Sequence, residues 1–315
     1  VSGDIIFPNN LTRFFSVLEM ISRQLMIVEP AIFSAHEPNI YCGMLIFLLV
    51  PLYALNPKIN IREKVGKFAL IFFFYISFNL NILNYIWHGF HFPNSLPCRQ
   101  SFIFNFLLLT MAYEGLRNLR SHSSKDIVRI VGIVTVLFLA IEHLMADDDY
   151  PYYIVYVSLL FVCLYAITLT LYRDRRIPRL ASISIFFLFI VLEAFINTLV
   201  TSVNTTGRTA YVKDNAAVTS VIKQVAKEDT SFYRIEKLKR RTKNDSAWHH
   251  YKGVSIFSST ANDGFADLLA GLGCEESTNS YSYYGSTPLT EALLSVKYVL
   301  SSELIDDTEL RTFYT

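Results

Sequence analysis

Six apolar segments, separated by short polar connections, constrain this chain more than any other feature of its sequence. Each segment is close to the roughly 17–25 residues that a helix needs to cross a bilayer. They cover residues 39–55, 68–87, 101–116, 129–145, 152–172 and 180–200. The mean hydropathy of +0.34 and the 52% of hydrophobic residues are high for a soluble domain. We therefore predict a polytopic α-helical membrane protein with about six transmembrane helices over residues 39–200.

The charges of the connections predict the orientation of these helices. Lysine and arginine concentrate in three connections, residues 56–67, 117–129 and 173–179. The alternate connections differ: residues 88–100 contain a single arginine, and residues 146–151 contain three aspartates and no basic residue. Because basic loops stay on the cytoplasmic side, the alternate connections and both ends of the chain are predicted to lie outside the cell.

Residues 1–38 are predicted to form an exterior, interfacial segment. Asn10 can cap a helix whose apolar residues recur at helical spacing. Those residues are Phe14, Leu18, Ile21 and Leu25, with charged side chains between them. The pattern favours an amphipathic helix lying on the membrane surface over one that spans it.

Residues after 200 have the composition of a soluble α/β domain. Small polar residues over 201–212 indicate a linker, and residues 213–315 form the predicted extracellular α/β domain, which we expect to be incomplete. Helical periodicity and strand-like alternation assign its elements. The expected helices cover residues 214–229 and 263–271, and the expected strands cover 231–238, 253–260 and 292–301.

The connection over residues 84–102 combines cationic side chains with prolines that restrict its backbone. Arginine can clamp a phosphate with two hydrogen bonds, and histidine can donate to it or protonate it. We therefore predict an anion-binding loop at the membrane boundary. The alternative is that these side chains only tie the hairpin together by hydrogen bonds. The candidate phosphate ligands are Arg99, His88 and His91, supported in the loop by Trp87 and Asn94.

Two other polar features of the membrane part have competing interpretations. Glu193 lies within the sixth apolar segment, where a carboxyl group either holds helices together or marks a transport pathway. We favour the structural role. The run Asp147, Asp148 and Asp149 could recruit a divalent cation through oxygen ligands, although such runs are usually solvated loops. No metal site and no definite cofactor are predicted, and a divalent metal stays an open alternative.

The exterior part carries weaker signals. The basic stretch 237–243 could bind an anionic polymer, but a solvated turn is slightly favoured. Tyr283 and Tyr284 could stack on the sugar rings of an acceptor, although tyrosines beside a glycine are common in plain loops. The four cysteines show neither metal-ligand spacing nor a disulfide framework. Cys42 and Cys98 could pair near the outer surface, but free thiols are expected.

Several stretches resemble the YfhO family, large bacterial membrane proteins of the GT-C glycosyltransferase type. The resemblance runs in order along nearly the whole chain. It is carried by EPNIYCG (37–43), YIWHGFHFPNSLPCRQSF (85–102), FYRIEK (232–237), KNDSAWHHYKGVSIFSST (243–260) and YYGSTPLTEALLSVKYVLS (283–301).

The resemblance implies a GT-C-like fold in a bacterial cell membrane. It also implies transfer of a sugar from a polyprenyl-phosphate donor to a cell-envelope acceptor such as teichoic acid, a polysaccharide or a protein. The expected partners are the lipid-linked donor, that acceptor and the lipid bilayer, with no nucleic acid. Family members begin with a membrane module whose first exterior loop carries the acidic catalytic residue, so this base is expected upstream of residue 1. Asp4 cannot be matched to it.

Two other functions compete with transfer. A transporter or flippase of lipid-linked sugars needs the same headgroup loop, with Glu193 as a relay, but often shows inverted repeats, which the six segments lack. A membrane sensor would use the exterior domain for ligand binding and would need a cytoplasmic output domain, whereas only short basic loops are predicted inside. An upstream membrane module with an acidic exterior loop would favour the enzyme.

Overall fold

A computed structural model describes residues 7–32, 36–90, 96–145, 151–201, 207–277 and 279–301. The chain divides into two compact units, Ile5–Thr205 and a second unit that begins at Thr206. Each unit has its own hydrophobic core. The predicted linker region contains a short helix, α9 (Arg208–Val212), at the start of the second unit.

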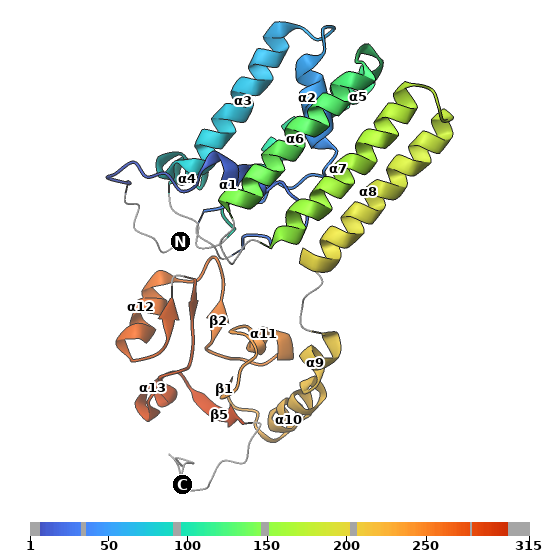
Figure 1. Cartoon of the computed structure of the whole chain (residues 1–315). Coiled ribbons are helices and arrows are strands. Elements are labelled where there is room, and N and C mark those ends of the chain that lie inside the picture. The colour runs from blue at the N-terminus through green and yellow to red at the C-terminus, as the bar shows by residue number, and fades with distance from the viewer. Residues whose placement is uncertain are drawn as a thin grey trace. The chain divides into compact units, whose positions relative to one another are not determined.

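The first unit is helical, and all six predicted apolar segments form helices in it (Figure 1). Within the described residues, three of these helices are long and apolar enough to cross a membrane: α6 (Ser124–Leu144), α7 (Tyr152–Arg173) and α8 (Arg179–Thr201). The helices are α1 (Val17–Ser22), α2 (Ile46–Leu55), α3 (Ile61–Asn79), α4 (Asn81–Trp87), α5 (Ser101–Arg117), the 3₁₀ turn η1 (Leu119–Ser121), α6 (Ser124–Leu144), α7 (Tyr152–Arg173) and α8 (Arg179–Thr201).

Two of the predicted segments differ in detail from the structure. The segment predicted over 39–55 becomes helical only at Ile46, because Gly43 adopts the left-handed region with φ +103°. The segment predicted over 68–87 is interrupted at Leu80, whose extended backbone (ψ 129°) separates α3 from α4. Both interruptions expose backbone groups that a continuous helix would pair internally.

The unit is built around α2, which packs against α5, α6 and α7. Leu48, Leu52 and Tyr53 of α2 are completely buried. α5 approaches α2 closely because Gly115 has no side chain: a Cβ there would lie 2.4 Å from the carbonyl oxygen of Leu49. Small residues of this kind allow membrane helices to pack backbone against backbone.

The distribution of polarity on α8 is the reverse of that in a soluble protein. The buried side chains of this helix are Ser182 and Glu193, whereas large apolar side chains such as Phe187 and Phe195 are exposed. Exposed apolar surface on this scale needs an apolar medium to cover it. The helix therefore turns its polar groups to the protein and its apolar face outward, as membrane-spanning helices do.

The N-terminal segment packs into the helical unit, where the sequence predicted a helix on the membrane surface. α1 has only six residues and is capped by Ser16, not by Asn10. Ser16 and Glu19 form a reciprocal capping box, a signal that the sequence SVLE carries. Leu25 and Met26 are completely buried, so this part of the segment belongs to the protein core.

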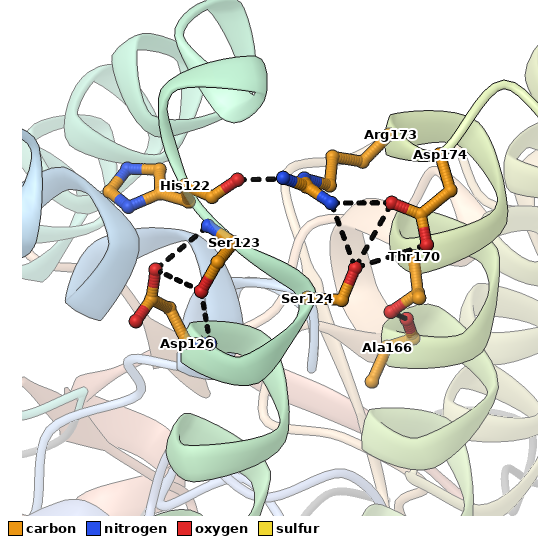
Figure 2. Close-up of polar contacts among 8 residues, drawn as sticks. All are labelled: His122, Ser123, Ser124, Asp126, Ala166, Thr170, Arg173 and Asp174. Carbon is orange, nitrogen blue, oxygen red and sulfur yellow. Dashed lines mark hydrogen bonds and ion pairs between the residues drawn. The ribbon is translucent and has the colours of Figure 1, made fainter.

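Hydrogen bonds join two loops at the end of the unit predicted to be cytoplasmic (Figure 2). Arg173 Nε donates to the carbonyl oxygen of His122 over 2.7 Å, and its Nη1 donates to Ser124 Oγ over 3.0 Å. Ser124 Oγ also donates to the Asp174 carboxylate at 3.0 Å. Each of these groups has a protein partner, so we infer that the cluster holds the α5–α6 and α7–α8 connections together.

The second unit mixes short helices with two small sheets. β1 (Arg234–Lys237) pairs in parallel with β5 (Val296–Leu300). β4 (Ser280–Tyr281) pairs antiparallel with both β2 (Ile256–Phe257) and β3 (Glu276–Ser277). The predicted helices are confirmed, the predicted strands are shorter than expected, and residues 292–293 end a helix. The remaining elements are α10 (Asn215–Glu228), β1 (Arg234–Lys237), α11 (Asp245–His249), β2 (Ile256–Phe257), α12 (Asp263–Gly271), β3 (Glu276–Ser277), β4 (Ser280–Tyr281), α13 (Pro288–Leu293) and β5 (Val296–Leu300).

Candidate functional site

Two asparagines at the break between α3 and α4 hold the N-terminal segment in place. Asn79 Oδ1 accepts hydrogen bonds from the backbone N–H groups of Phe14 and Phe15 at 3.0 and 2.9 Å, and its amide donates to the Phe15 carbonyl. Asn81 Oδ1 accepts from the Thr12 N–H at 3.1 Å. The break between α3 and α4 thus places two amide side chains against the non-helical backbone of residues 12–15.

The predicted anion-binding loop begins where α4 ends. His88 is buried, and its Nδ1 lies 2.7 Å from the carbonyl oxygen of Asn84. Since a carbonyl oxygen can only accept, Nδ1 carries the proton, which fixes the imidazole tautomer. Trp87 is partly exposed and stacks on Phe74, with ring centroids 6.4 Å apart. Arg99 is exposed, two residues before α5 begins.

His91 and Asn94 lie outside the described residues, so their predicted roles stay predictions. The ends of the same loop that are described have an unusual backbone. Phe90, Leu96 and Cys98 have φ values of +63°, +53° and +51°, which side chains other than glycine seldom adopt. Strained residues of this kind persist only where their surroundings hold them, and they often mark functional segments.

Contacts with the chain before α2 hold this strained loop. The Leu96 N–H donates to the carbonyl oxygen of Ile32 at 2.8 Å, and Cys98 Sγ donates to that of His36 at 3.3 Å. The His36 ring in turn stacks on Phe14, with ring centroids 3.6 Å apart. The loop is therefore held directly by Ile32 and His36, and His36 is in turn packed against Phe14.

Glu193 joins three parts of the same unit. Its Oε1 accepts from the Tyr41 hydroxyl at 2.7 Å and from the Met44 N–H at 2.6 Å, and its Oε2 accepts from the Tyr165 hydroxyl at 2.5 Å. The residue is only 4% exposed. This confirms the prediction that Glu193 is hydrogen-bonded between helices. It lies eight residues before the end of α8, or about 12 Å along the axis.

Other side chains of the bundle satisfy the irregular backbone before α2. The Met26 N–H donates to Ser158 Oγ of α7 at 3.2 Å, and the Ile27 N–H donates to Asn197 Oδ1 of α8 at 2.7 Å. Ile27 has a φ of +69°. Non-helical backbone survives at membrane depth only where protein groups or water satisfy it. These contacts therefore build a polar, irregular layer among apolar helices.

Figure 1 shows α1, α4 and the C-terminal end of α8 at the same end of the first unit. Asn79 and Asn197 belong to this end, because they lie near the C-terminal ends of α3 and α8. By the charge pattern of the connections, this is the predicted outer end. A fixed imidazole, an exposed guanidinium and a held backbone at the boundary of a bilayer can bind and orient an anionic headgroup.

The aspartate run, Asp147, Asp148 and Asp149, lies outside the described residues, as does Asp4. Among the residues that the structure does describe, no three His, Cys, Asp or Glu side chains are grouped so that they could hold a metal ion. All four cysteines, each in a described segment, are free thiols, as expected.

The exterior candidates Tyr283 and Tyr284 are both engaged within the second unit. Tyr283 is buried, and its hydroxyl donates to Glu291 Oε1 at 2.6 Å. The Tyr284 hydroxyl donates to the Leu238 carbonyl, and the Arg240 guanidinium lies 3.9 Å from the centre of its ring. These positions give no support to sugar stacking on Tyr283, and Arg240 covers one face of Tyr284.

The sequence did not indicate the partners of Glu193. Tyr41 and Gly43 lie within the stretch YCG and Tyr165 in a segment that reads only as apolar, so no local pattern connects them with a residue on α8. The one available signal was the glycine itself, since glycine is the default residue where the backbone takes a positive φ. A Cβ at this glycine would lie 3.8 Å from Glu193 Oε1.

Comparison with known protein families agrees with the resemblance seen in the sequence. The family model described as "Bacterial membrane protein YfhO" matches residues 6–313. Searches of the curated proteins and of the solved structures found no match.

Proposed function

Since the chain belongs to the YfhO family of bacterial membrane proteins, we propose that it forms part of a membrane glycosyltransferase. This enzyme moves a sugar from a polyprenyl-phosphate donor to a cell-envelope acceptor on the outer face. In this proposal all six apolar segments cross the membrane. One span consists of α2 and the residues leading into it, and another consists of α3 followed by α4. The second unit then lies outside the cell.

The observation that carries the proposal is the strained loop between α4 and α5, which holds His88 and Arg99 at the predicted outer end of apolar helices. A polyprenyl-phosphate donor places its phosphate at this depth. When an acceptor hydroxyl attacks the anomeric carbon, the bond from that carbon to the phosphate oxygen breaks and the lipid phosphate leaves with the electron pair. Positive charge held beside the leaving oxygen lowers the barrier to this step.

His88 and Arg99 have different roles in this step. The guanidinium of Arg99 clamps two phosphate oxygens and orients the donor. His88 is buried and its Nδ1 proton is committed to the Asn84 carbonyl, so its role in the proposal is to hold the start of the loop that carries Arg99. The base that takes the acceptor proton is assigned to none of the described residues.

The proposal is tested with the full-length protein in membranes of the producing cells. Transfer of radiolabel from a polyprenyl-phosphate sugar to cell-envelope polymer is measured for the natural protein and for Arg99→Ala. Arg62→Ala, at an exposed arginine near the start of α3, serves as the matched control. We expect transfer by the natural protein and the control only. Movement of the intact lipid-linked sugar across the membrane without transfer would favour a transporter and contradict the proposal.

A further inference from the structure

The second unit contains a cavity of about 570 Å³ between α9, α10, α11 and the ends of β1 and β5. This volume is within the range of small-molecule sites, which cover roughly 300–1,000 Å³. All of its lining residues belong to the second unit, so the cavity does not depend on how the two units are arranged. It includes most of the basic stretch 237–243, for which the sequence favoured a solvated turn.

One wall of the cavity is aromatic and apolar. Trp248 of α11 is 53% exposed, and its ring meets the Tyr211 ring edge to face with centroids 5.7 Å apart. Val218 and Val221 of α10 lie along the same cavity. An indole so open to solvent is unusual, because tryptophan is highly buried on average. Its exposed face can stack on the C–H groups of a sugar ring.

The rest of the lining is largely cationic. Four lysine or arginine side chains and two aspartates line the cavity, and one of the four, Arg240, pairs with Glu275 outside the lining. Four cations against three carboxylates still leave a positive net charge. Asp245 is largely neutralised, since it accepts from the Lys237 ammonium at 3.0 Å and from the Arg241 backbone N–H at 2.8 Å. Arg241 is held beside the aromatic wall: its guanidinium lies 5.0 Å from the Tyr211 ring centre and donates to the Ala210 carbonyl at 3.1 Å.

The cavity also offers acceptors, which an all-basic anion site would lack. The Asp214 carboxylate is 70% exposed and pairs loosely with Arg241 at 3.8 Å. Burial lowers the pKa of the His249 imidazole, which keeps this ring neutral and able to accept a hydrogen bond. Sugar hydroxyl groups both donate and accept, so they need such a mixture.

We propose that this cavity is a binding site for an anionic saccharide, with a sugar ring on Trp248 and its phosphate or carboxylate group toward Arg241. The site goes beyond the transfer reaction and does not depend on it. Only the further assignment of this saccharide as the acceptor rests on the proposed function. A failed transfer assay would therefore leave the binding site standing, and absent binding would leave the transfer reaction standing.

The test measures binding by isothermal titration to the full chain in nanodiscs, without any lipid-linked donor. The probes are glucose 6-phosphate, glucose alone and inorganic phosphate alone. We expect glucose 6-phosphate to bind about tenfold or more tightly than either fragment, because ring stacking and ion pairing add in one ligand. Equal binding of inorganic phosphate would mean that no sugar is recognised and would overturn the proposal. No binding of glucose 6-phosphate would also overturn it.

Variants test whether the ligand binds in this cavity. Trp248→Ala and Arg241→Gln should each weaken glucose 6-phosphate binding about tenfold, and Trp248→Phe should retain most of it. The matched controls are Phe257→Ala, at an exposed aromatic outside the cavity, and Lys223→Gln, at a lysine of α10 that lies away from it. Melting temperatures show which variants are folded. Unchanged affinity in a folded Arg241→Gln protein would rule the cavity out, even if the Trp248 variant failed to fold.

Discussion

The hydroxyl of Tyr165 on α7 donates a hydrogen bond to Oε2 of Glu193 on α8 over 2.5 Å. Both residues are buried, and the other carboxylate oxygen of Glu193 accepts from Tyr41 and Met44. A single side chain of α8 thereby links α7 to the irregular segment before α2. We expect the packing here to depend on the hydrogen-bond acceptors of Glu193 and not on a charge.

Tyr165→Phe should lower the free energy of unfolding by about 1–3 kcal/mol, because it removes a buried hydrogen bond. Glu193→Gln should cost less than Glu193→Ala, since its amide oxygen still accepts from Tyr41 and Met44 while its N–H₂ group donates to the Tyr165 oxygen. Unfolding in mixed detergent measures these differences. Tyr113→Phe, at an exposed tyrosine of α5, is the control.

The same variants separate the structural role of Glu193 from a transport relay. In the full-length protein, Glu193→Gln should retain sugar transfer, since the network survives without a charge. A well-folded Glu193→Gln protein that has lost turnover would contradict the structural role and favour transport.

Asn79→Ala should release the N-terminal segment. The Phe15 N–H and the Phe15 carbonyl both lose their partner on this side chain, which should destabilise the unit by about 1–3 kcal/mol. Hydrogen exchange of residues 12–16 measures the effect directly and should rise. Asn118→Ala is the control, because that side chain bonds only within its own helix region. Equal protection in both variants would show that the asparagine does not hold the segment.

The sequence predicted the helices better than it predicted the breaks between them. Apolar composition is a local property, so runs such as 152–172 were assigned to helices without knowledge of their neighbours. The Met44 and Tyr41 contacts with Glu193 span 149 and 152 residues, and no local pattern carries such information. The break at Leu80 likewise depends on hydrogen bonds to a segment about 65 residues earlier.

The misassigned cap of α1 has a different cause. Asn10 is a good capping residue, but its backbone carbonyl accepts from the Asn81 amide, and the helix begins later at Ser16. The alternative signal, a serine three residues before a glutamate, was present in the sequence. Local capping preferences therefore identified a helix but not its first residue. The tertiary contacts of the preceding chain decided between the two caps.

Glu275 should make the stability of the second unit depend on pH. Its hydrogen bond from Arg240, together with one from Ser282, lowers the pKa of this carboxyl from 4.5 to about 2. A lowered folded-state pKa contributes stability that is fully present above about pH 4.5 and is lost as the pH falls toward 2. The effect should be small, since the Glu275 side chain is 43% exposed and solvent screens the pair.

Glu275→Gln should therefore flatten the pH dependence of unfolding between pH 4.5 and 2. Urea unfolding of the full chain, followed by Trp248 fluorescence in a Trp87→Phe background, measures it. Glu276→Gln, at the exposed neighbouring residue of β3, should leave the pH dependence as it is. If the Glu275→Gln protein kept the pH dependence of the natural protein, that dependence would arise from other carboxyl groups.

The orientation of the chain is tested by cysteine labelling of intact cells. In a cysteine-free background, a cysteine at position 223 should react with a membrane-impermeant maleimide, and one at position 176 should react only after permeabilisation. Both positions are exposed, and Arg176 lies in the basic connection between α7 and α8. Labelling of position 176 in intact cells, or protection of position 223, would contradict the predicted orientation.

Substitutions at Arg99 distinguish two roles for this residue, binding the donor phosphate and holding the loop in place. Arg99→Lys keeps the charge but loses the planar pair of donors, so it should impair donor binding while leaving the melting temperature unchanged. Arg99→Ala should weaken donor binding by about 2–5 kcal/mol, the range for truncating one partner of a desolvated charge pair. If Arg99 only fastened the loop, both variants would lower the melting temperature and turnover together. Donor affinity and melting temperature, measured on the same purified full-length variants, decide between these outcomes. Unchanged donor affinity with a lowered melting temperature would exclude the clamp. Arg99 would then serve only to hold the loop, whose backbone is strained at Leu96 and Cys98.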